Sequence, residues 1–529
     1  MPLAKLKSLP QEPPVATPAP RENRRLAAID IGTNSIRSIV VEARPGRDFQ
    51  VLDDEKATVR LGEGLAASGE ICPAAWERAR DALARMLKIQ QGYGVSAVEA
   101  VATSAVRQAR NGAAFVAAIQ DELGLAIEVI SGEEEAELAF LSARSSFEMD
   151  NLHYALVDIG GGSAEIITTM GSQIEDIFSL DLGAVVLTEK FLPNDPISPE
   201  EHQRLRKHIR ATLKKNLRDR DSAVQCLIGS GGTLTTIAAM VMAQRREQFN
   251  SFQGYEVLRS EVVHLLAMLL RKPLRERRAV SGLAPERADI IIAGMTVVDE
   301  LMRRFGTNIL KVNERGIRHG LILRSLEKYG LAPRARKPVN WRTAVLSFAR
   351  ACHFHEDHAD QVARLSLSMF DALAPSFELD SRQRRLLEAA ALLHDVGYFI
   401  NYARHHKHSY HLIRHASLFG FSPREQEIIA NIARYHRRAL PKKNHENLLG
   451  LSGEDRRAVA RLGGILRLAD GLDRRRSRVV QSIACRLDGE RFHVHLGGAE
   501  DLSVEIYGGE SKRDLFEATF ARKLALSAD

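Results

Sequence analysis

Cysteine and long apolar runs are scarce in this sequence. The 529 residues include four cysteines, and their spacing matches neither a metal site nor a disulfide framework. We therefore expect a reducing compartment, the cytoplasm. No apolar run reaches the roughly 18 residues of a spanning helix, so we expect no transmembrane segment, while association with a membrane surface stays open. The cysteines are Cys72, Cys226, Cys352 and Cys485.

The sequence also lacks a secretory signal segment and has few aromatic residues. Residues 1–24 lack the apolar segment of a secretory signal and are rich in proline, alanine and basic residues, so we expect a disordered tail there. Phe, Trp and Tyr make up 6% of the chain, and no basic stripe alternates with them. A surface that stacks bases is therefore not expected, and we expect no nucleic-acid partner.

Positive charge is in surplus. The formal net charge is +7 and the isoelectric point about 9.2, which favours polyanionic partners such as polyphosphate, nucleotides or an anionic membrane surface. Hydrophobic residues make up 45% and charged residues 27% of the chain, as in ordinary globular proteins. The length predicts several domains.

A glycine-rich motif extends from Leu156 to Ile167. An apolar run leads to Asp158, three glycines and Ser163 follow, and a second apolar run begins after Glu165. Glycines let backbone N–H groups surround an anion, so we expect a phosphate cradle formed by Gly160, Gly161, Gly162 and Ser163. We expect Asp158 and Glu165 to hold a divalent cation against the phosphate. A plain β-hairpin explains this stretch equally well when it is taken alone.

The same pattern occurs again elsewhere in the chain. One copy, near the N-terminus, leads from an apolar run into Asp30, Gly32, Thr33, Asn34 and Ser35, and a third glycine loop contains Gly231, Gly232 and Thr233. Duplicated strand–turn–strand loops that face one cleft resemble the actin-like, sugar-kinase and Hsp70-type ATPase fold, which is ribonuclease H-like. We accordingly predict an α/β protein with fold domain I at 25–146 and domain II at 147–332.

Two charged residues near the end of domain I are further candidates. Ser131 and Glu134 have the spacing of a capping box and start a helix, which leaves Glu135 without a structural role. We expect Glu135 to reach the cleft as a general base. Arg107 follows a predicted strand at 95–103, where it is either a planar phosphate contact or a solvated surface arginine.

After a proline-containing linker near 331–338, the periodicity becomes wholly helical. We predict a helical domain at 333–480 and a small α+β cap at 481–529, with strands at 491–496 and 502–507. The helical domain contains histidines and aspartates in the order of the ligands of HD-type metal phosphohydrolases, which it resembles. A basic, solvated face is the alternative. The candidate metal ligands are His358, His394, Asp395, His408, His436 and Asp470.

From about residue 25 to 520 the sequence resembles the exopolyphosphatase and guanosine pentaphosphate phosphatase (Ppx/GppA) family. The motifs that carry the resemblance are DIGTNS, TSAVR, ISGEEEA, DIGGGSAE, GSGGT and NERGIRHG. The resemblance implies Mg²⁺-dependent release of terminal orthophosphate from inorganic polyphosphate, with Glu135 as base. It implies that Asp158, Gly160 and Glu165 hold metal and phosphate, with the Asp30 loop and Arg107 as further phosphate contacts. Mn²⁺, K⁺ and a second divalent metal in the helical domain are further expectations, as is a homodimer.

Other functions remain open at this point. Guanosine pentaphosphate 5'-phosphohydrolase is the first alternative, and an HD-type hydrolase that uses the N-terminal part as a binding module is the second. A phosphotransferase with an acceptor substrate and a nucleotide sensor without turnover are weaker. Glu135 beside its capping box argues against the phosphotransferase, and Glu135, Asp158 and Glu165 together argue against the sensor.

Overall fold

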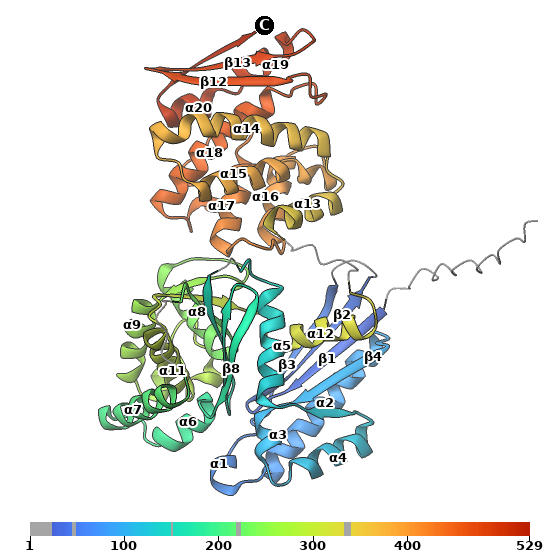
Figure 1. Cartoon of the computed structure of the whole chain (residues 1–529), viewed down its shortest axis with the longest axis vertical. Coiled ribbons are helices and arrows are strands. Elements are labelled where there is room, and N and C mark those ends of the chain that lie inside the picture. The colour runs from blue at the N-terminus through green and yellow to red at the C-terminus, as the bar shows by residue number, and fades with distance from the viewer. Residues whose placement is uncertain (1–23, 45–48, 150–151, 218–223, 333–339) are drawn as a thin grey trace, which may run out of the picture.

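The computed structural model describes residues 24–44, 49–149, 152–217, 224–332 and 340–529. All but the last residue of the predicted tail and most of the predicted linker therefore lie outside the described residues. Two lobes lie side by side, the helical domain lies at one end of the pair, and the C-terminal cap is farthest from the lobes (Figure 1). In the described part of the chain, no helix combines the length and apolar character needed to span a bilayer.

Lobe 1 is built on a five-stranded sheet with the order β3-β2-β1-β4-β5. β1 forms an antiparallel hairpin with β2, while β1, β4 and β5 are parallel. The strands are β1 Arg24–Ile31, β2 Ser35–Ala43, β3 Gln50–Thr58, β4 Ala97–Ala102 and β5 Ile127–Val129. The helices are α1 Leu65–Ser68, α2 Pro73–Gly92, α3 Ser104–Gln108, α4 Gly112–Leu123 and α5 Gly132–Arg144.

Alternation along β1 gives this sheet two apolar faces. Ile29 and Ile31 pack with the core formed by α2 and α4, whereas Leu26 and Ala28 pack with α5 and α12 (Ile317–Lys328). The helix α12 thus comes late in the chain but lies across the sheet of lobe 1 (Figure 1). The residues 317–332, which we assigned to the second domain by sequence, pack mainly against the first.

Lobe 2 contains a six-stranded sheet with the order β10-β11-β9-β6-β7-β8. Its hairpin β6–β7 is antiparallel, and β6 is parallel to β9. Lobe 1 has the same arrangement, in which β1 and β2 form the antiparallel hairpin and β1 is parallel to β4. The strands are β6 His153–Ile159, β7 Ala164–Met170, β8 Gln173–Leu180, β9 Leu227–Ser230, β10 Glu256–Leu258 and β11 Ile309–Asn313. The helices are α6 Ala184–Phe191, α7 Pro199–Asn216, α8 Gly232–Arg245, α9 Arg259–Leu270, α10 Leu274–Arg277, η1 Pro285–Arg287 and α11 Ile291–Arg304.

The predicted helical domain and cap share a single apolar core, in which Phe492, Phe516 and Phe520 of the cap join the helices. The helices are α13 Trp341–Ala351, α14 Glu356–Phe377, α15 Ser381–Leu393, η2 Val396–Phe399, α16 His405–His415, α17 Pro423–Arg434, η3 Glu446–Leu448 and α18 Gly453–Gly471. The cap contains β12 Ser482–Asp488, β13 Arg491–Gly497, α19 Ser503–Glu510, α20 Asp514–Phe520 and β14 Lys523–Ala528. Its sheet has the order β12-β13-β14.

One predicted strand of the cap is wrong. The residues 502–507 form the start of α19, not a strand. This short alternating run is compatible with both a strand and a helix. A buried ion pair accompanies the helical form. Glu505 is fully buried and accepts from Arg475, with Nη2 2.7 Å from Oε2. Gly508 lies so close to α18 that a Cβ on it would meet the Gly471 carbonyl, which a helix with two glycines permits.

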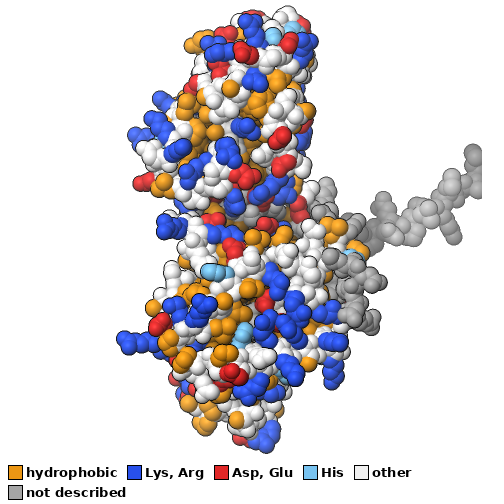
Figure 2. Space-filling model, turned by 90° about the vertical axis from the view of Figure 1, so that its left-hand side faces the viewer, with side chains coloured by type: hydrophobic (Ala, Val, Ile, Leu, Met, Phe, Trp, Pro, Cys, Tyr) orange, Lys and Arg blue, Asp and Glu red, His pale blue; other side chains and the backbone are white. Residues whose placement is uncertain are grey.

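A few polar contacts hold the helical domain against the lobes. Arg315 Nη2 lies 2.7 Å from Ser417 Oγ, and Arg414 donates to the carbonyl of Gln248 over 2.9 Å. The Trp341 N–H donates to Glu148 Oε1 over 2.7 Å. On the face shown in Figure 2, Lys and Arg side chains are scattered among Asp and Glu over both the lobes and the helical domain.

Candidate functional site

A cleft between the two lobes brings the three glycine loops together. Residues from both sheets and from α5, α8 and α12 form its wall. The predicted site residues that line it are Asp30, Gly32, Thr33, Asn34, Ser35, Glu135, Asp158, Gly160, Gly161, Gly162, Ser163, Gly231 and Gly232. Arg107, Glu165 and Thr233 lie behind this wall and not on it.

The loops after β1 and β6 have the same structure. In each, a strand delivers an aspartate one residue before its end and a short turn returns the chain. The Gly32 N–H donates to the Ser35 carbonyl over 3.2 Å, and the Gly160 N–H donates to the Ser163 carbonyl over 3.0 Å. The duplication inferred from sequence is thus a duplication of hydrogen-bonded geometry.

The two loops also pack against each other. A Cβ on Gly161 would lie 2.9 Å from Thr33 Cβ, and one on Gly162 would meet the hydroxyl of Ser104. Glycine is required here because the side chains of Thr33 and Ser104 in lobe 1 lie directly against the loop backbone of lobe 2. The cleft floor is therefore one continuous surface shared by both lobes.

The third loop turns sharply toward Asp158. Gly231 has a φ of +99°, and a Cβ there would lie 3.0 Å from Asp158 Oδ1. The helix α8 starts immediately afterwards, so its first N–H groups lie at the cleft. Thr233 is one step further and is fully buried, where the guanidinium of Arg287 lies 3.4 Å from its hydroxyl. Its hydroxyl therefore lies behind the cleft wall beside Arg287, and a phosphate contact by Thr233 stays a prediction.

A group of buried acids forms the centre of the site. Burial raises the pKa of Asp158 to about 7 and that of Glu165 to about 8, and it also raises the pKa of Asp30. Asp158 and Glu165 face each other as a cross-strand pair. Asp30 Oδ1 and Glu165 Oε2 are buried without a hydrogen-bond partner. Carboxylates in this state fit a hard divalent cation, because a cation would satisfy the orphaned oxygens and relieve the mutual repulsion.

Glu135 lies on the same wall at the start of α5. The predicted capping box is present, since the Glu134 N–H donates to Ser131 Oγ over 3.1 Å and Glu134 Oε2 accepts from the Ser131 N–H over 2.8 Å. Glu135 takes no part in it. Burial, helped by Glu165 and Asp30, raises the pKa of Glu135 well above its ordinary value, while Arg107 opposes that rise.

Arg107 differs from the expectation of a phosphate contact. Its guanidinium lies behind the wall, where Nη1 donates to the Ile130 carbonyl over 2.6 Å and to Glu135 Oε2 over 3.4 Å. The strand β4 and the helix α3 point it at the start of α5 and not at the cleft. Its direct partner in this structure is the candidate base.

Among the described residues, three arginines line the cleft, and the sequence analysis did not assign them: Arg37, Arg287 and Arg318. Arg37 is the cross-strand partner of Asp30, and an arginine in the apolar run of β2 was the available signal. Arg318 belongs to the NERGIRHG motif that we quoted without assigning its residues. Burial lowers the pKa of Arg287 to about 10, so at neutral pH it is a cation without bulk water around it. No local pattern marked Arg287.

Two models of known protein families match the chain. The sequence model of the Ppx/GppA phosphatase family matches residues 39–329, and the model of domain III of that family matches 341–504. The chain belongs to the Ppx/GppA phosphatase family.

Solved structures of family members resemble part of the chain. A crystal structure of the Aquifex aeolicus family member is 28% identical, with a TM-score of 0.51, and the match covers 58% of this chain and 99% of that one. An exopolyphosphatase from Cytophaga hutchinsonii is 27% identical with a TM-score of 0.55, and the match covers 58% of this chain and 100% of that one. The two lobes have the actin-like ATPase-type fold expected from the duplicated loops. The likeness of the helical domain to HD-type hydrolases stays an expectation.

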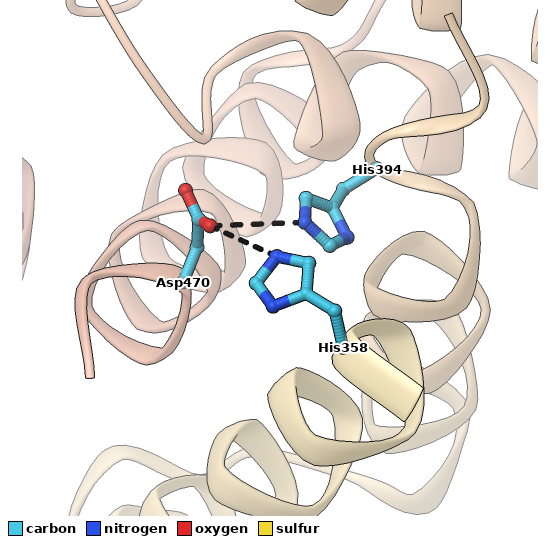
Figure 3. A group of neighbouring side chains, drawn as sticks. All are labelled: His358, His394 and Asp470. Carbon is cyan, nitrogen blue, oxygen red and sulfur yellow. Dashed lines mark ion pairs between the residues drawn. The ribbon is translucent and has the colours of Figure 1, made fainter. Parts of the chain in front are cut away.

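Domain III brings most of its predicted ligands together. His358, His394 and Asp470 form one cluster, and Asp395, His405 and His436 form another next to it. Figure 3 shows both imidazoles of the first cluster turned toward the Asp470 carboxylate. His408 belongs to neither cluster and is half-buried. The residue of α16 that joins the second cluster is His405, which was not among the predicted ligands.

Proposed function

We propose that this member of the Ppx/GppA family hydrolyses phosphoanhydride bonds and releases terminal orthophosphate from inorganic polyphosphate. One observation carries the proposal. Glu135 is a buried acid that plays no part in the cap of its helix and lies on one cleft wall with two phosphate-type glycine loops. Its position at the cleft supports a role as the base that removes a proton from water.

The terminal phosphoryl group would be gripped from several directions. The turn amides of the first two loops and the start of α8 offer hydrogen-bond donors, and Arg37, Arg287 and Arg318 offer cationic ones. Asp30, Asp158 and Glu165 would hold Mg²⁺, with Mn²⁺ and K⁺ as further candidates. When bound, the cation would supply charge neutralisation at the phosphate oxygens.

Water attack would follow from the placement of Glu135. In its ionised form the Glu135 carboxylate accepts a proton from a water molecule as the water oxygen forms a bond to phosphorus. The bond between phosphorus and the bridging oxygen breaks, and the shortened chain leaves with that oxygen. Arg107 acts through Glu135, because the guanidinium fixes the carboxylate and favours its charged form.

The lining of the cleft supports polyphosphate over guanosine pentaphosphate. Among the described residues that line it, none is aromatic, so a guanine base would find no stacking partner there. Its cationic and amide donors recognise phosphate without regard to what the phosphate is attached to. The Cytophaga hutchinsonii relative is described as an exopolyphosphatase, which points the same way.

The deciding experiment compares substrates side by side. We expect phosphate release from long polyphosphate to have a higher kcat/KM than the release from guanosine pentaphosphate, with Glu135→Gln inactive on both. A clear preference for guanosine pentaphosphate would assign the cleft to the nucleotide. If Glu135→Gln still hydrolysed both substrates, the reaction would not take place in this cleft.

A further inference from the structure

Four buried histidines of domain III converge on one place from four different elements. His358 is in the first turn of α14 and His394 follows the end of α15, while His405 starts α16 and His436 follows α17. Each is 1% exposed or less. Histidines this deeply buried need partners for both ring nitrogens, since an unpaired polar group is costly in a core.

All four histidines are held by the same ring nitrogen. The Nδ1 of each lies within hydrogen-bond distance of an oxygen acceptor: Asp473 Oδ2 at 2.7 Å for His358, Ala391 O at 2.7 Å for His394, Tyr402 O at 3.0 Å for His405 and Ala433 O at 2.6 Å for His436. Carbonyl and carboxylate oxygens accept hydrogen bonds, so Nδ1 must carry the hydrogen in each ring. In the neutral ring, Nε2 then carries no hydrogen and offers its lone pair. Fixing one ring nitrogen in order to present the other is the arrangement of histidine ligands in metal proteins.

The four Nε2 atoms face two carboxylates at the spacing of metal ligands. Asp470 Oδ1 is 3.4 Å from the Nε2 of His358 and 3.8 Å from that of His394. Asp395 Oδ2 is 3.8 and 3.6 Å from the same two atoms. Ligands that lie about 2.0–2.1 Å from a tetrahedral ion are about 3.3 Å apart, which is close to these separations.

Asp395 offers its other oxygen to the second pair of histidines. Its Oδ1 is 3.2 Å from His405 Nε2 and 3.7 Å from His436 Nε2. These two Nε2 atoms are 3.3 Å apart. With both Nδ1 atoms acting as donors, two lone pairs face each other there. The Arg437 guanidinium lies beside them, with Nη1 3.4 Å from His405 Nε2, and a metal cation between the two nitrogens would satisfy both lone pairs. The buried atoms left without a hydrogen-bond partner include Nε2 of His358, Nε2 of His394 and Asp395 Oδ1.

We propose that domain III binds two divalent transition-metal ions bridged by Asp395. The first ion would take His358, His394, Asp470 and Asp395 Oδ2, and the second would take Asp395 Oδ1, His405 and His436. Imidazole with carboxylate suits Mn, Fe or Zn. This site is separate from the cleft, and it does not depend on the function proposed there.

The charges around the centre identify the class of its further ligand. Two dications exceed the charge of the two carboxylates, and the three protein ligands of the second ion leave it open positions. Arg476 Nη2 lies 2.6 Å from Asp395 Oδ2 and 2.9 Å from the Tyr398 hydroxyl, and Lys512 is paired with Asp470. Arg476 is one-third exposed and adopts a φ of +55°, a strained conformation for a non-glycine residue. The centre would therefore bind an anion with several oxygens, the phosphate group of a phosphate ester.

Metal content of the full-length, untagged protein tests the centre directly. After loading with Mn²⁺, Fe²⁺ or Zn²⁺ and dialysis, elemental analysis should find about two transition-metal ions per chain. His394→Gln and His436→Gln should each remove about one. The matched control is His411→Gln with His415→Gln, an exposed pair on α16, which should leave the content unchanged. Glu135→Gln should also leave it unchanged, because that residue belongs to the cleft.

A variant next to the ligands keeps the proposal testable if the ligand variants themselves do not fold. Asp473→Asn keeps the volume and weakens the hold on His358 Nδ1, while its Oδ1 can still accept from the Arg478 N–H. The affinity for the first ion should therefore fall by about 10- to 100-fold. In Co²⁺-loaded protein the visible absorption reports the imidazole-bound ions, and inorganic phosphate should change that spectrum in wild type.

Each result has an opposite that would overturn the proposal. No transition metal after loading would mean that protons and ion pairs alone hold the cluster. Equal loss of metal in the exposed histidine pair would assign the metal to the surface. A Co²⁺ spectrum that phosphate leaves unchanged would refute the anion class, and metal loss in Glu135→Gln would move the ions to the cleft.

Discussion

Arg107 donates a hydrogen bond to Glu135, with Nη1 3.4 Å from Oε2. This contact joins a residue expected to bind phosphate to the residue expected to deprotonate water. Glu135 therefore has a cation on one side and the acids Asp30, Asp158 and Glu165 on the other. The balance between them sets the pH at which Glu135 can accept a proton.

Replacing Glu135 should stop turnover and spare binding. The variant Glu135→Gln keeps the size of the side chain and loses the proton acceptor, so kcat should fall by about 10²- to 10⁴-fold. The affinity for polyphosphate, measured by titration calorimetry on the inactive variant, should stay within a factor of a few. Glu134→Gln is the matched control. It alters the capping box one residue away and should leave kcat nearly unchanged.

Removing Arg107 should move the pH profile. Arg107 lowers the pKa of Glu135, so Arg107→Met should raise that pKa further, and the acidic limb of kcat/KM should shift to higher pH. Arg107→Lys restores a cation and should recover part of the shift. If Arg107→Met instead raised KM at every pH without moving the limb, the guanidinium would be a direct phosphate contact.

The stability of lobe 2 should depend on pH and Mg²⁺ together. In the folded protein the pKa values of Asp158 and Glu165 are raised from 3.8 and 4.5 to about 7 and about 8. The folded state therefore binds more protons than the unfolded state across this interval, and the free energy of unfolding should fall as the pH rises through it. Added Mg²⁺ should raise the melting temperature more at pH 8 than at pH 6, as measured by differential scanning fluorimetry. In Asp158→Asn this difference should shrink, and an equal Mg²⁺ effect at both pH values in wild type would contradict the site.

Arg318 should contribute a salt-sensitive share of substrate affinity. It lines the cleft, and its guanidinium is also paired with the Asp54 carboxylate, with Nη2 3.2 Å from Oδ2. Arg318→Gln should raise KM for polyphosphate and reduce the slope of log kcat/KM against log salt, because one cationic contact is lost. Arg278→Gln removes an exposed arginine of lobe 2 and serves as the control for net charge. Identical slopes in the two variants would exclude a contact between Arg318 and the substrate.

Local patterns predicted the backbone of the cleft well. The aspartate–glycine–serine turns follow from apolar runs and glycine, both of which act over a few residues, and the Ser131 cap is also local. The direction of Arg107 and the presence of Arg287 were not predictable in this way. Each depends on which distant segment lies beside it: Ile130 and Glu135 for the former, Thr233 for the latter.

Short segments in domain III misled the sequence analysis for a similar reason. His405 and His408 are three residues apart in a histidine-rich run, and composition cannot tell which of them the neighbouring helices bury. The run at 502–507 fits a strand until the buried partner Arg475 of Glu505 is known. Both outcomes were fixed by tertiary packing.

The common core of the helical domain and the cap makes these two predicted domains one body. A chain cut at residue 480 would leave the helices without Phe492, Phe516 and Phe520 and would expose the apolar surface that these rings cover. Such a fragment would aggregate. The natural division of this protein for engineering or domain exchange lies before α13, where an intact two-lobed phosphatase body and an intact helical body can each be taken as a unit.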